Sequence, residues 1–167
     1  MEISNDNGGA VKAPLFLKES KMELEELKLN VSRHYLIQLA MKFMGTPYVW
    51  GGSTPFGFDC SGFIIWVFQV FELLGSKDWT ADQLSKMFEK TEIMTPGDLV
   101  FYGKERINHI GIYIGELNGT PMMISAAGGD SSTISIEKAR LRNAKVKIKP
   151  VNYRSDFQFA CNIGKKL

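Results

Sequence analysis

The sequence predicts an α+β fold in which helices come first and strands follow. Two apolar segments in the first half, RHYLIQLAMKFM from residue 33 and FIIWVFQVFELL from residue 63, are long enough for helices. From residue 95 the pattern changes to short, β-rich, partly alternating runs that are separated by turn residues. This order is typical of helices packed on an antiparallel sheet or a small barrel.

The composition indicates one globular domain and argues against several classes of protein. The chain has 167 residues, of which 44% are hydrophobic and 23% are charged, as expected for a single domain with a substantial hydrophobic core. The net charge of +2 is too small to indicate nucleic-acid binding. A mild concentration of basic residues between Arg140 and Lys149 is expected to be a solvated face. No apolar run is long enough to span a bilayer.

The N-terminal segment differs from the rest of the chain. We expect residues 1–30 to form a partly extended arm and residues 31–167 to form the main domain. The first twenty or so residues are polar apart from the apolar cluster 15–17, and only residues 21–30 have some helical character. The chain does not begin with a basic segment followed by a long apolar one, so no signal peptide is expected.

The first predicted helix covers residues 33–44. Ser32 has the character of an N-cap, Gly45 ends the helix and Pro47 blocks its continuation. His34, in the first turn, is expected to be exposed rather than catalytic. The apolar positions that share one face of this helix are Leu36, Leu39, Ala40 and Phe43.

The second predicted helix follows the stretch YVWGGSTPFGFDCSG at residues 48–62, which contains Cys60. A Gly- and Pro-rich loop before a long apolar run places Cys60 at the start of a buried helix. Unpaired backbone N–H groups and the helix dipole stabilise a thiolate there, and a thiolate is a nucleophile. Asp59 or Ser61 is expected to cap this helix. The alternative is a cysteine that merely packs as a small buried hydrophobic residue.

The second half of the chain predicts one more helix and then the sheet. Thr80 to Gln83 has the spacing of a capping box, which predicts a helix over residues 80–90. Asn118–Gly119 predicts a hairpin turn. The predicted strands lie within residues 95–103, 109–116, 121–127, 132–137, 145–151 and 157–163.

A nucleophilic cysteine requires a base, and His109 is well placed to provide it. The chain has two histidines, and His109 begins a predicted strand, where the backbone is rigid. The alternative is a strand-end histidine bonded to the loop at Asn108. Cys161 lies in an apolar strand pattern and is expected in the core. Since the sequence has no CxxC motif, metal-ligand cluster or phosphate loop, we expect no metal and no cofactor.

Several motifs together resemble a known family. They are GTPYVWGG, FDCSGF, TADQ, PGDLVFY and HIGIYIG, in that order. In these motifs the chain is similar to the NlpC-type cysteine peptidases, which are cell-wall endopeptidases with a papain-like α+β core. The resemblance covers about residues 32–126 and implies that residues 31–167 are a catalytic domain.

The resemblance implies roles for individual residues. Cys60 would be the nucleophile and His109 the base. Tyr48 would line the site and help to bind the oxyanion, together with the backbone N–H of Cys60. Asp59 and Ser61 would join Tyr48 in binding substrate, holding the free amine of a stem peptide. The structural alternatives are a helix cap for Asp59 and Ser61 and a packed ring for Tyr48.

One position departs from the family pattern. Where the family has His, Asn or Gln to orient the imidazole, this sequence has Ser125. Ser125 could suffice as the third catalytic residue, or Asp130 could provide this group, or the site could be weakened. Nucleophile, base and oxyanion donors remain in each case.

The function implied by the resemblance is hydrolysis of amide bonds in peptidoglycan stem peptides through a thioester, most often between D-Glu and a diamino acid. The first alternative is an inactive or weak wall-binding or structural module of the same fold. The second is a thiol acyltransferase or amidase. The expected partner is a peptidoglycan peptide. Without a visible leader, the chain would reach the wall through a larger assembly, such as a virion or secretion apparatus, as a phage- or mobile-element-borne lysin, or with a leader that is missing here.

Overall fold

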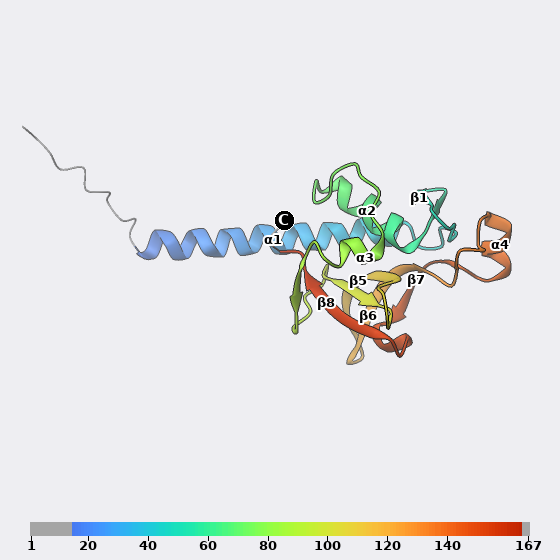
Figure 1. Cartoon of the computed structure of the whole chain (residues 1–167). Coiled ribbons are helices and arrows are strands. Elements are labelled where there is room, and N and C mark those ends of the chain that lie inside the picture. Colours follow the sequence, from blue (N-terminus) through green and yellow to red (C-terminus); the bar gives the residue numbers. More distant parts are fainter. Residues whose placement is uncertain (1–14, 165–167) are drawn as a thin grey trace, which may run out of the picture.

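A computed structural model of the chain describes residues 15–164 (Figure 1). We predicted a partly extended arm over residues 1–30, of which residues 1–14 lie outside the described residues. The helices are α1 (Leu15–Lys42), α2 (Cys60–Val70), α3 (Ala81–Leu84), α4 (Ile136–Leu141) and the 3-10 helix η1 (Val151–Tyr153). The strands are β1 (Ser53–Thr54), β2 (Gly57–Phe58), β3 (Glu89–Thr91), β4 (Leu99–Tyr102), β5 (His109–Leu117), β6 (Thr120–Ala127), β7 (Lys145–Pro150) and β8 (Phe157–Asn162).

The main sheet is antiparallel and has six strands in the order β3-β8-β4-β5-β6-β7. Strands β3 and β7 form its edges, so the sheet is open and does not close into the small barrel that was one of the two predicted forms. The predicted α+β arrangement of helices on an antiparallel sheet is confirmed. The hairpin between β5 and β6 is also confirmed, with positive φ angles of 51° at Asn118 and 75° at Gly119.

Alternating side chains of the sheet pack on its two faces. One set belongs to the main core together with α2, and its members include Leu99, Phe101, Ile110, Ile112 and Ile124. The other set forms a smaller cluster on the opposite face, which includes Val100, Tyr102, Tyr113 and Met123. Both faces are therefore apolar, and the exposed positions of the sheet lie mainly in β3, in β8 and at the hairpin ends.

Helix α2 is buried and is capped by Asp59. The carboxylate Oδ1 of Asp59 accepts a hydrogen bond from the backbone N–H of Gly62 at 2.7 Å, which satisfies one of the free donors at the helix start. Of the two caps that the sequence allowed, Asp59 is therefore the one that forms. A Cβ built on Gly62 would overlap the carbonyl of Gly52, so glycine is required where the preceding loop lies against the helix.

Helix α1 is one continuous helix and extends beyond the rest of the molecule (Figure 1). The helix start that we predicted at Ser32 is wrong, because Ser32 lies inside α1. The physical reason is that residues 15–44 contain neither glycine nor proline, so nothing interrupts the backbone hydrogen bonds. The boundary that we predicted at residue 30 falls within this helix.

A buried ion pair fastens α1 to the sheet. Arg33 is 4% exposed, and its Nη1 lies 2.8 Å from Oδ1 of Asp98, which has no exposed surface. Arg33 also donates to the carbonyl of Pro96 at 3.0 Å and to Oδ1 of Asn162 at 3.0 Å. Asp98 in turn accepts the backbone N–H of Thr95 at 2.8 Å. The pair therefore joins the C-terminal half of α1 to the segment before β4 and to the end of β8.

Two other element predictions need correction. The capping box of Thr80 and Gln83 is confirmed, but α3 ends at Leu84, and residues 89–91 pair with β8 as strand β3. Residues 132–137 were predicted as a strand. They form a turn and the start of α4, because Ser135 caps that helix by accepting the N–H of Lys138 at 3.3 Å.

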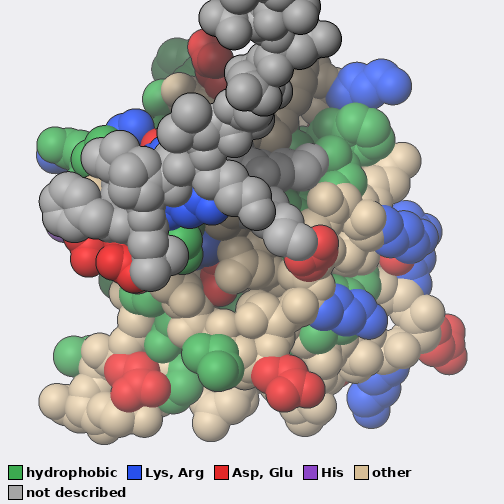
Figure 2. Space-filling model, turned by 90° about the vertical axis from the view of Figure 1, so that its left-hand side faces the viewer, with side chains coloured by type: hydrophobic (Ala, Val, Ile, Leu, Met, Phe, Trp, Pro, Cys, Tyr) green, Lys and Arg blue, Asp and Glu red, His purple; other side chains and the backbone are tan. Residues whose placement is uncertain are grey.

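The charge on the described surface is mixed. On the face that Figure 2 shows, Lys and Arg side chains gather toward one side and acidic side chains lie among them. Among residues 15–164, no helix combines the length and apolarity needed to cross a membrane.

Candidate active site

Cys60 is the first residue of α2, as the sequence predicts, and its side chain lies against the start of β5. It is 8% exposed, and its Sγ lies 3.8 Å from the carbonyl oxygen of Asn108. The backbone N–H of Ile110 also faces the sulfur and favours its anionic form. The thiol therefore lies beside the two residues that flank His109, so the structure brings the two predicted catalytic residues together.

His109 is the first residue of β5 and is nearly buried, with 6% exposure. Its Nε2 lies 3.3 Å from Oγ of Ser125, which has no exposed surface and comes from the neighbouring strand β6. The rings of Tyr102 and Tyr153 lie with their centroids 5.7 and 6.1 Å from the imidazole. These contacts hold the ring from one side and leave Nδ1 as the nitrogen that does not face Ser125.

Burial keeps the thiol and the imidazole neutral. The pKa of Cys60 is raised to about 12, chiefly by burial and then by Asp59, and backbone N–H groups at the helix start offset part of this rise. Burial lowers the pKa of His109 to about 3, with a smaller contribution from Arg154. The helix start was expected to stabilise a thiolate at Cys60. The backbone N–H groups do favour the anion, but the cost of burying it is larger, so the net shift of the pKa is upward.

Arg154 links several groups around the histidine, and no sequence pattern predicted this role. Its Nε donates to Oδ1 of Asp156 at 2.7 Å, and its Nη2 donates to Oδ1 of Asn108 at 2.9 Å. The guanidinium also lies 5.6 Å from the centre of the Tyr102 ring. Asp156 partly offsets the effect of Arg154 on the pKa of His109. No motif marks this residue, since it lies in a turn far from His109 in the sequence.

Tyr48 lies beside Cys60 and is only 3% exposed. A Cβ on Gly129 would overlap the tyrosine ring, so the backbone after β6 packs directly on it. The pKa of Tyr48 is raised, chiefly by burial and then by the proximity of Cys60 and Asp59. Tyr48 therefore keeps its hydroxyl proton and can donate a hydrogen bond.

Asp59 and Ser61 flank the nucleophile and bond to each other. The hydroxyl of Ser61 donates to Oδ1 of Asp59 at 3.0 Å, and the N–H of Gly51 donates to Oδ2 at 3.0 Å. The capping role of Asp59 is thus part of the structure. Oδ2 still has capacity to accept a further donor from the groove, because a carboxylate oxygen accepts more than one hydrogen bond.

Asp130 does not contact the imidazole. Its carboxylate is exposed and binds Arg142 at 2.6 Å and the hydroxyl of Ser132 at 2.7 Å. These hydrogen bonds lower its pKa. The sequence analysis left two candidates for the residue that orients the imidazole, Ser125 and Asp130. In the structure only Ser125 of these two lies within hydrogen-bond distance of His109.

A groove of about 320 Å³ opens over the thiol. Sequence reasoning identified four of its residues, namely Tyr48, Asp59, Cys60 and Ser61, and missed the others. The residues that it missed as parts of the site are Trp50, Thr80, Ala81, Arg106, Ile107 and Asn108. Thr80 and Ala81 belong to the TADQ motif, so the match of that motif was the available indication for them. The loop residues 106–108 carry no such pattern.

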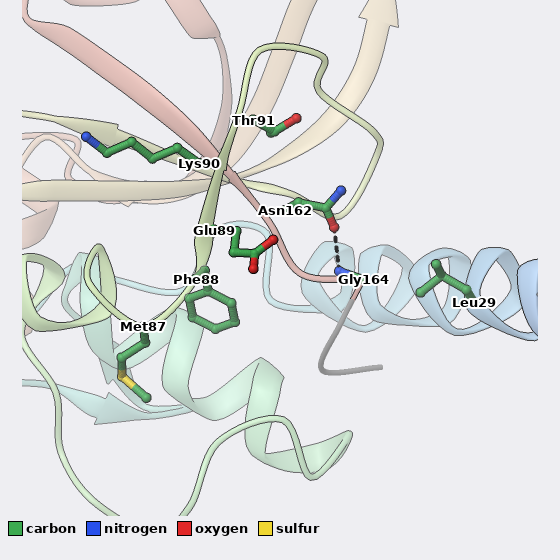
Figure 3. A pocket seen from close by; sticks show the side chains of 8 residues that line it. All are labelled: Leu29, Met87, Phe88, Glu89, Lys90, Thr91, Asn162 and Gly164. Atoms are coloured by element: carbon green, nitrogen blue, oxygen red, sulfur yellow. Dashed lines mark hydrogen bonds between the residues drawn. The ribbon is translucent and has the colours of Figure 1, made fainter.

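A second groove, of about 640 Å³, lies elsewhere on the molecule, beside α1 (Figure 3). Its lining residues are Leu29, Met87, Phe88, Glu89, Lys90, Thr91, Asn162 and Gly164. The dashed line in Figure 3 is the hydrogen bond from the N–H of Gly164 to Oδ1 of Asn162, at 2.6 Å. This groove is lined by neither cysteine nor histidine, so the candidate active site is the groove at Cys60.

Comparisons with known proteins agree with this assignment. Residues 45–150 match the model of the NlpC/P60 family. The chain is 36% identical over 103 residues to a gamma-D-glutamyl-L-lysine dipeptidyl-peptidase of Bacillus subtilis. This match covers 59% of this chain and 34% of that protein. It is 45% identical over 91 residues to the probable peptidoglycan endopeptidase LytE of the same species, covering 52% of this chain and 25% of LytE.

The fold comparison gives the same result. The chain is similar to the crystal structure of the NlpC/p60 domain of the peptidoglycan hydrolase SagA, with a TM-score of 0.60 and 29% identity. This match covers 78% of the chain and 97% of that domain. The chain thus spans a whole solved domain but only about a quarter to a third of the two curated relatives. Because the family model matches more than half of its length, the chain belongs to the NlpC/P60 family and has its papain-like α+β fold.

Proposed function

We propose that this chain is a cysteine peptidase that hydrolyses an amide bond in peptidoglycan stem peptides. The observation that carries the proposal is the position of the Cys60 thiol, 3.8 Å from the carbonyl of Asn108 and therefore next to His109, at the floor of an open groove. A nucleophile and a base that come from a helix start and a strand start are held by rigid elements. Cys60 is the only cysteine among the residues that line this groove.

In the first half of the proposed reaction, Cys60 is acylated. Sγ forms a bond to the amide carbon while its proton passes to Nδ1 of His109. The imidazolium then gives this proton to the leaving nitrogen, and the C–N bond breaks. The products of this half are a free amine and a thioester on Cys60.

In the second half, water takes the place of the amine. His109 accepts a proton from water as the water oxygen attacks the thioester carbon. The C–S bond breaks, and the thiolate recovers the proton from the imidazolium. The sum of both halves is hydrolysis of one amide bond, and the enzyme returns to its neutral thiol and imidazole.

The neutral resting pair fits this sequence of proton transfers. Since the pKa of Cys60 is raised to about 12 and that of His109 is lowered to about 3, the pair does not ionise in the free protein. The proton therefore moves when the thiol attacks the carbonyl, as it does for a serine nucleophile. Ser125 supports the transfer when its Oγ accepts the Nε2–H of His109, because Nδ1 then has a free lone pair.

Two donors would bind the oxyanion. They are the hydroxyl of Tyr48 and the backbone N–H of Cys60, and donors of this kind each contribute on the order of 3 kcal/mol. The raised pKa of Tyr48 supports its role as a donor, because the hydroxyl keeps its proton near the developing charge. The tight packing of Gly129 against the ring limits its movement.

The proposed bond joins γ-D-Glu to a diamino acid. Support comes from the curated relative that is named as a gamma-D-glutamyl-L-lysine dipeptidyl-peptidase. Asp59 and Ser61 support the recognition of a free amine, since both residues line the groove and the Asp59 carboxylate can accept hydrogen bonds from an ammonium group. The substrate would then present the N-terminal L-Ala of a stem peptide to these residues.

A set of matched peptides tests this proposal by mass spectrometry. The parent chain is incubated with L-Ala-γ-D-Glu-diaminopimelate-D-Ala, with the same peptide acetylated at its amine, and with an α-linked L-Glu analogue. We expect cleavage of the first peptide at the γ-D-Glu bond, with weaker cleavage of the acetylated peptide and none of the α-linked one. Equal cleavage of all three would overturn the proposed specificity while leaving the peptidase assignment intact.

A further inference from the structure

Helix α1 has two apolar sides, and only one of them faces the domain. Leu29 lines the groove of Figure 3, and Leu36 and Ala40, on the same side, have no exposed surface. Leu27 and Val31 are each two residues from Leu29, which puts them about 160° around the helix axis from it. They are 60% and 45% exposed. The side of α1 that is turned away from the domain is therefore apolar as well.

The exposed residues form a continuous stripe. Leu24, Leu27, Val31 and Tyr35 are separated by three, four and four residues, and they are 50%, 60%, 45% and 60% exposed. We call these four residues the α1 stripe. Spacings of three and four place side chains along one seam of a helix, as in a coiled coil. A single exposed leucine is ordinary, but an apolar row on a projecting helix marks an interaction surface.

We propose that the α1 stripe is a dimer interface, on which a second copy of this chain packs its own stripe in a parallel arrangement. In coiled-coil positions, Leu24 and Val31 occupy a and Leu27 occupies d, whereas Tyr35 falls at e and borders the seam beside the exposed His34 at d. Glu23 then occupies g, while Lys28 occupies e.

The bordering charges favour a parallel pair over an antiparallel one. In a parallel pair, a g residue faces the e residue of the following turn on the other helix, so Glu23 of each copy faces Lys28 of the other. In an antiparallel pair, e residues face e residues, which would bring Lys21 and Lys28 of the two copies together. All three of these side chains are exposed and available. Among residues 15–164 of one copy, the ion pair of Lys28 is with exposed Glu25, at 3.1 Å.

The geometry of the domain also permits this arrangement. The α1 stripe lies on the side of α1 that is opposite the domain. When two stripes pack together around a two-fold axis, the two domains therefore lie on the outer sides of the helix pair and do not collide. The C-terminal half of α1 is already fixed by the buried pair of Arg33 and Asp98. The cost of starting a helix is therefore met before association. Since the stripe extends over fewer than three heptads, we expect a dimer that dissociates on dilution.

Sedimentation velocity of the full chain over a ~100-fold range of concentration tests the proposal, because association makes the observed mass depend on concentration. The parent is expected to shift from monomer to dimer. Leu27→Lys places a charge in the seam and should weaken the association by about tenfold or more. Met22→Lys is the matched control, since Met22 is 72% exposed on α1 but lies on the other side of the helix. It should dimerise like the parent.

The orientation has its own test. Ser20 is exposed and lies seven residues before Leu27, at the preceding d position. In a parallel dimer, two Ser20→Cys thiols would face each other and form a disulfide, tested in a Cys60→Ser background. Parallel association predicts rapid cross-linking that Leu27→Lys abolishes. A parent that stays monomeric at all concentrations would overturn the interface, and dimers without cross-linking would overturn the parallel arrangement. Loss of association in both Leu27→Lys and Met22→Lys would also contradict the stripe.

Discussion

The imidazole Nε2 of His109 lies 3.3 Å from the hydroxyl Oγ of Ser125, and both side chains are removed from solvent. A serine at this place orients the ring with one uncharged acceptor. It neither stabilises an imidazolium by charge nor holds the ring by two bonds. The site therefore has an orienting group that is weaker than a carboxylate, and its contribution can be measured.

Removing this hydroxyl should slow the reaction without abolishing it. We expect Ser125→Ala to lower kcat by about one to two orders of magnitude with little change in KM, because the nucleophile, the base and the oxyanion donors all remain. Steady-state kinetics on the stem peptide measure this effect. Ser125→Cys is the matched variant, since it fills the same space with a poor acceptor. If Ser125→Cys restored full activity, packing rather than hydrogen bonding would be the role of Ser125.

The charges around His109 should set the acidic limb of the pH profile. Arg154 lowers the pKa of His109 and Asp156 raises it. The base works in its neutral form, so activity is lost as pH falls through its pKa. Arg154→Gln should raise that pKa and move the acidic limb of kcat/KM to higher pH, whereas Asp156→Asn should move it to lower pH. Arg140→Gln, an exposed arginine on α4, serves as the control.

Opposite shifts by Arg154→Gln and Asp156→Asn are the diagnostic result. A general loss of structure would lower activity at every pH without moving the limb in two directions. Two variants that shift the limb in the same direction would contradict the electrostatic account.

Stability should fall in acid because of His109. Its pKa is about 3 in the folded chain and 6.5 as the ordinary value, so between these pH values the unfolded chain binds a proton that the folded chain does not. The free energy of unfolding should thus decrease as pH falls from about 6.5 toward 3. Denaturant titrations at several pH values measure the slope, and His109→Gln should flatten it. His34→Gln, at the exposed histidine of α1, is the matched substitution for comparison.

The buried ion pair should matter far more to stability than exposed pairs do. Asp98→Ala leaves the guanidinium of Arg33 buried without its partner, which costs about 3–5 kcal/mol of unfolding free energy. Lys86→Ala removes an exposed pair with Asp82 and should change stability little. Urea unfolding compares the two variants. Similar small effects of both would show that Arg33 reaches water or another acceptor when Asp98 is absent.

The sequence predicted the parts of the fold that local patterns determine. The glycine-rich loop before an apolar run located α2 and put Cys60 at its first residue. Asn118–Gly119 located the hairpin of β5 and β6, and the capping box located the start of α3. These features depend on backbone conformation within a few residues, which residue types reveal.

Other features depend on contacts between distant segments. Strand β3 exists because residues 89–91 find the free edge of β8, and no local pattern predicted it. The same holds for Arg154, which reaches Asn108 from the other end of the chain. The position of Cys60 at a helix start predicted a lowered pKa, whereas its pKa is raised. The reason is that the effect of a helix dipole can be inferred from sequence position, but burial depends on how the whole site packs. Polar helix residues at 18–28 concealed the length of α1.

The most direct test of the account is the cleavage of L-Ala-γ-D-Glu-diaminopimelate-D-Ala by the parent chain and by Cys60→Ala, followed by mass spectrometry. Both proteins are first shown to be folded by their thermal unfolding. We expect the parent to release L-Ala-γ-D-Glu and Cys60→Ala to release none. Equal cleavage by both proteins would contradict the role of Cys60, and no cleavage by the folded parent would contradict the proposed peptidase and favour a binding module of the same fold.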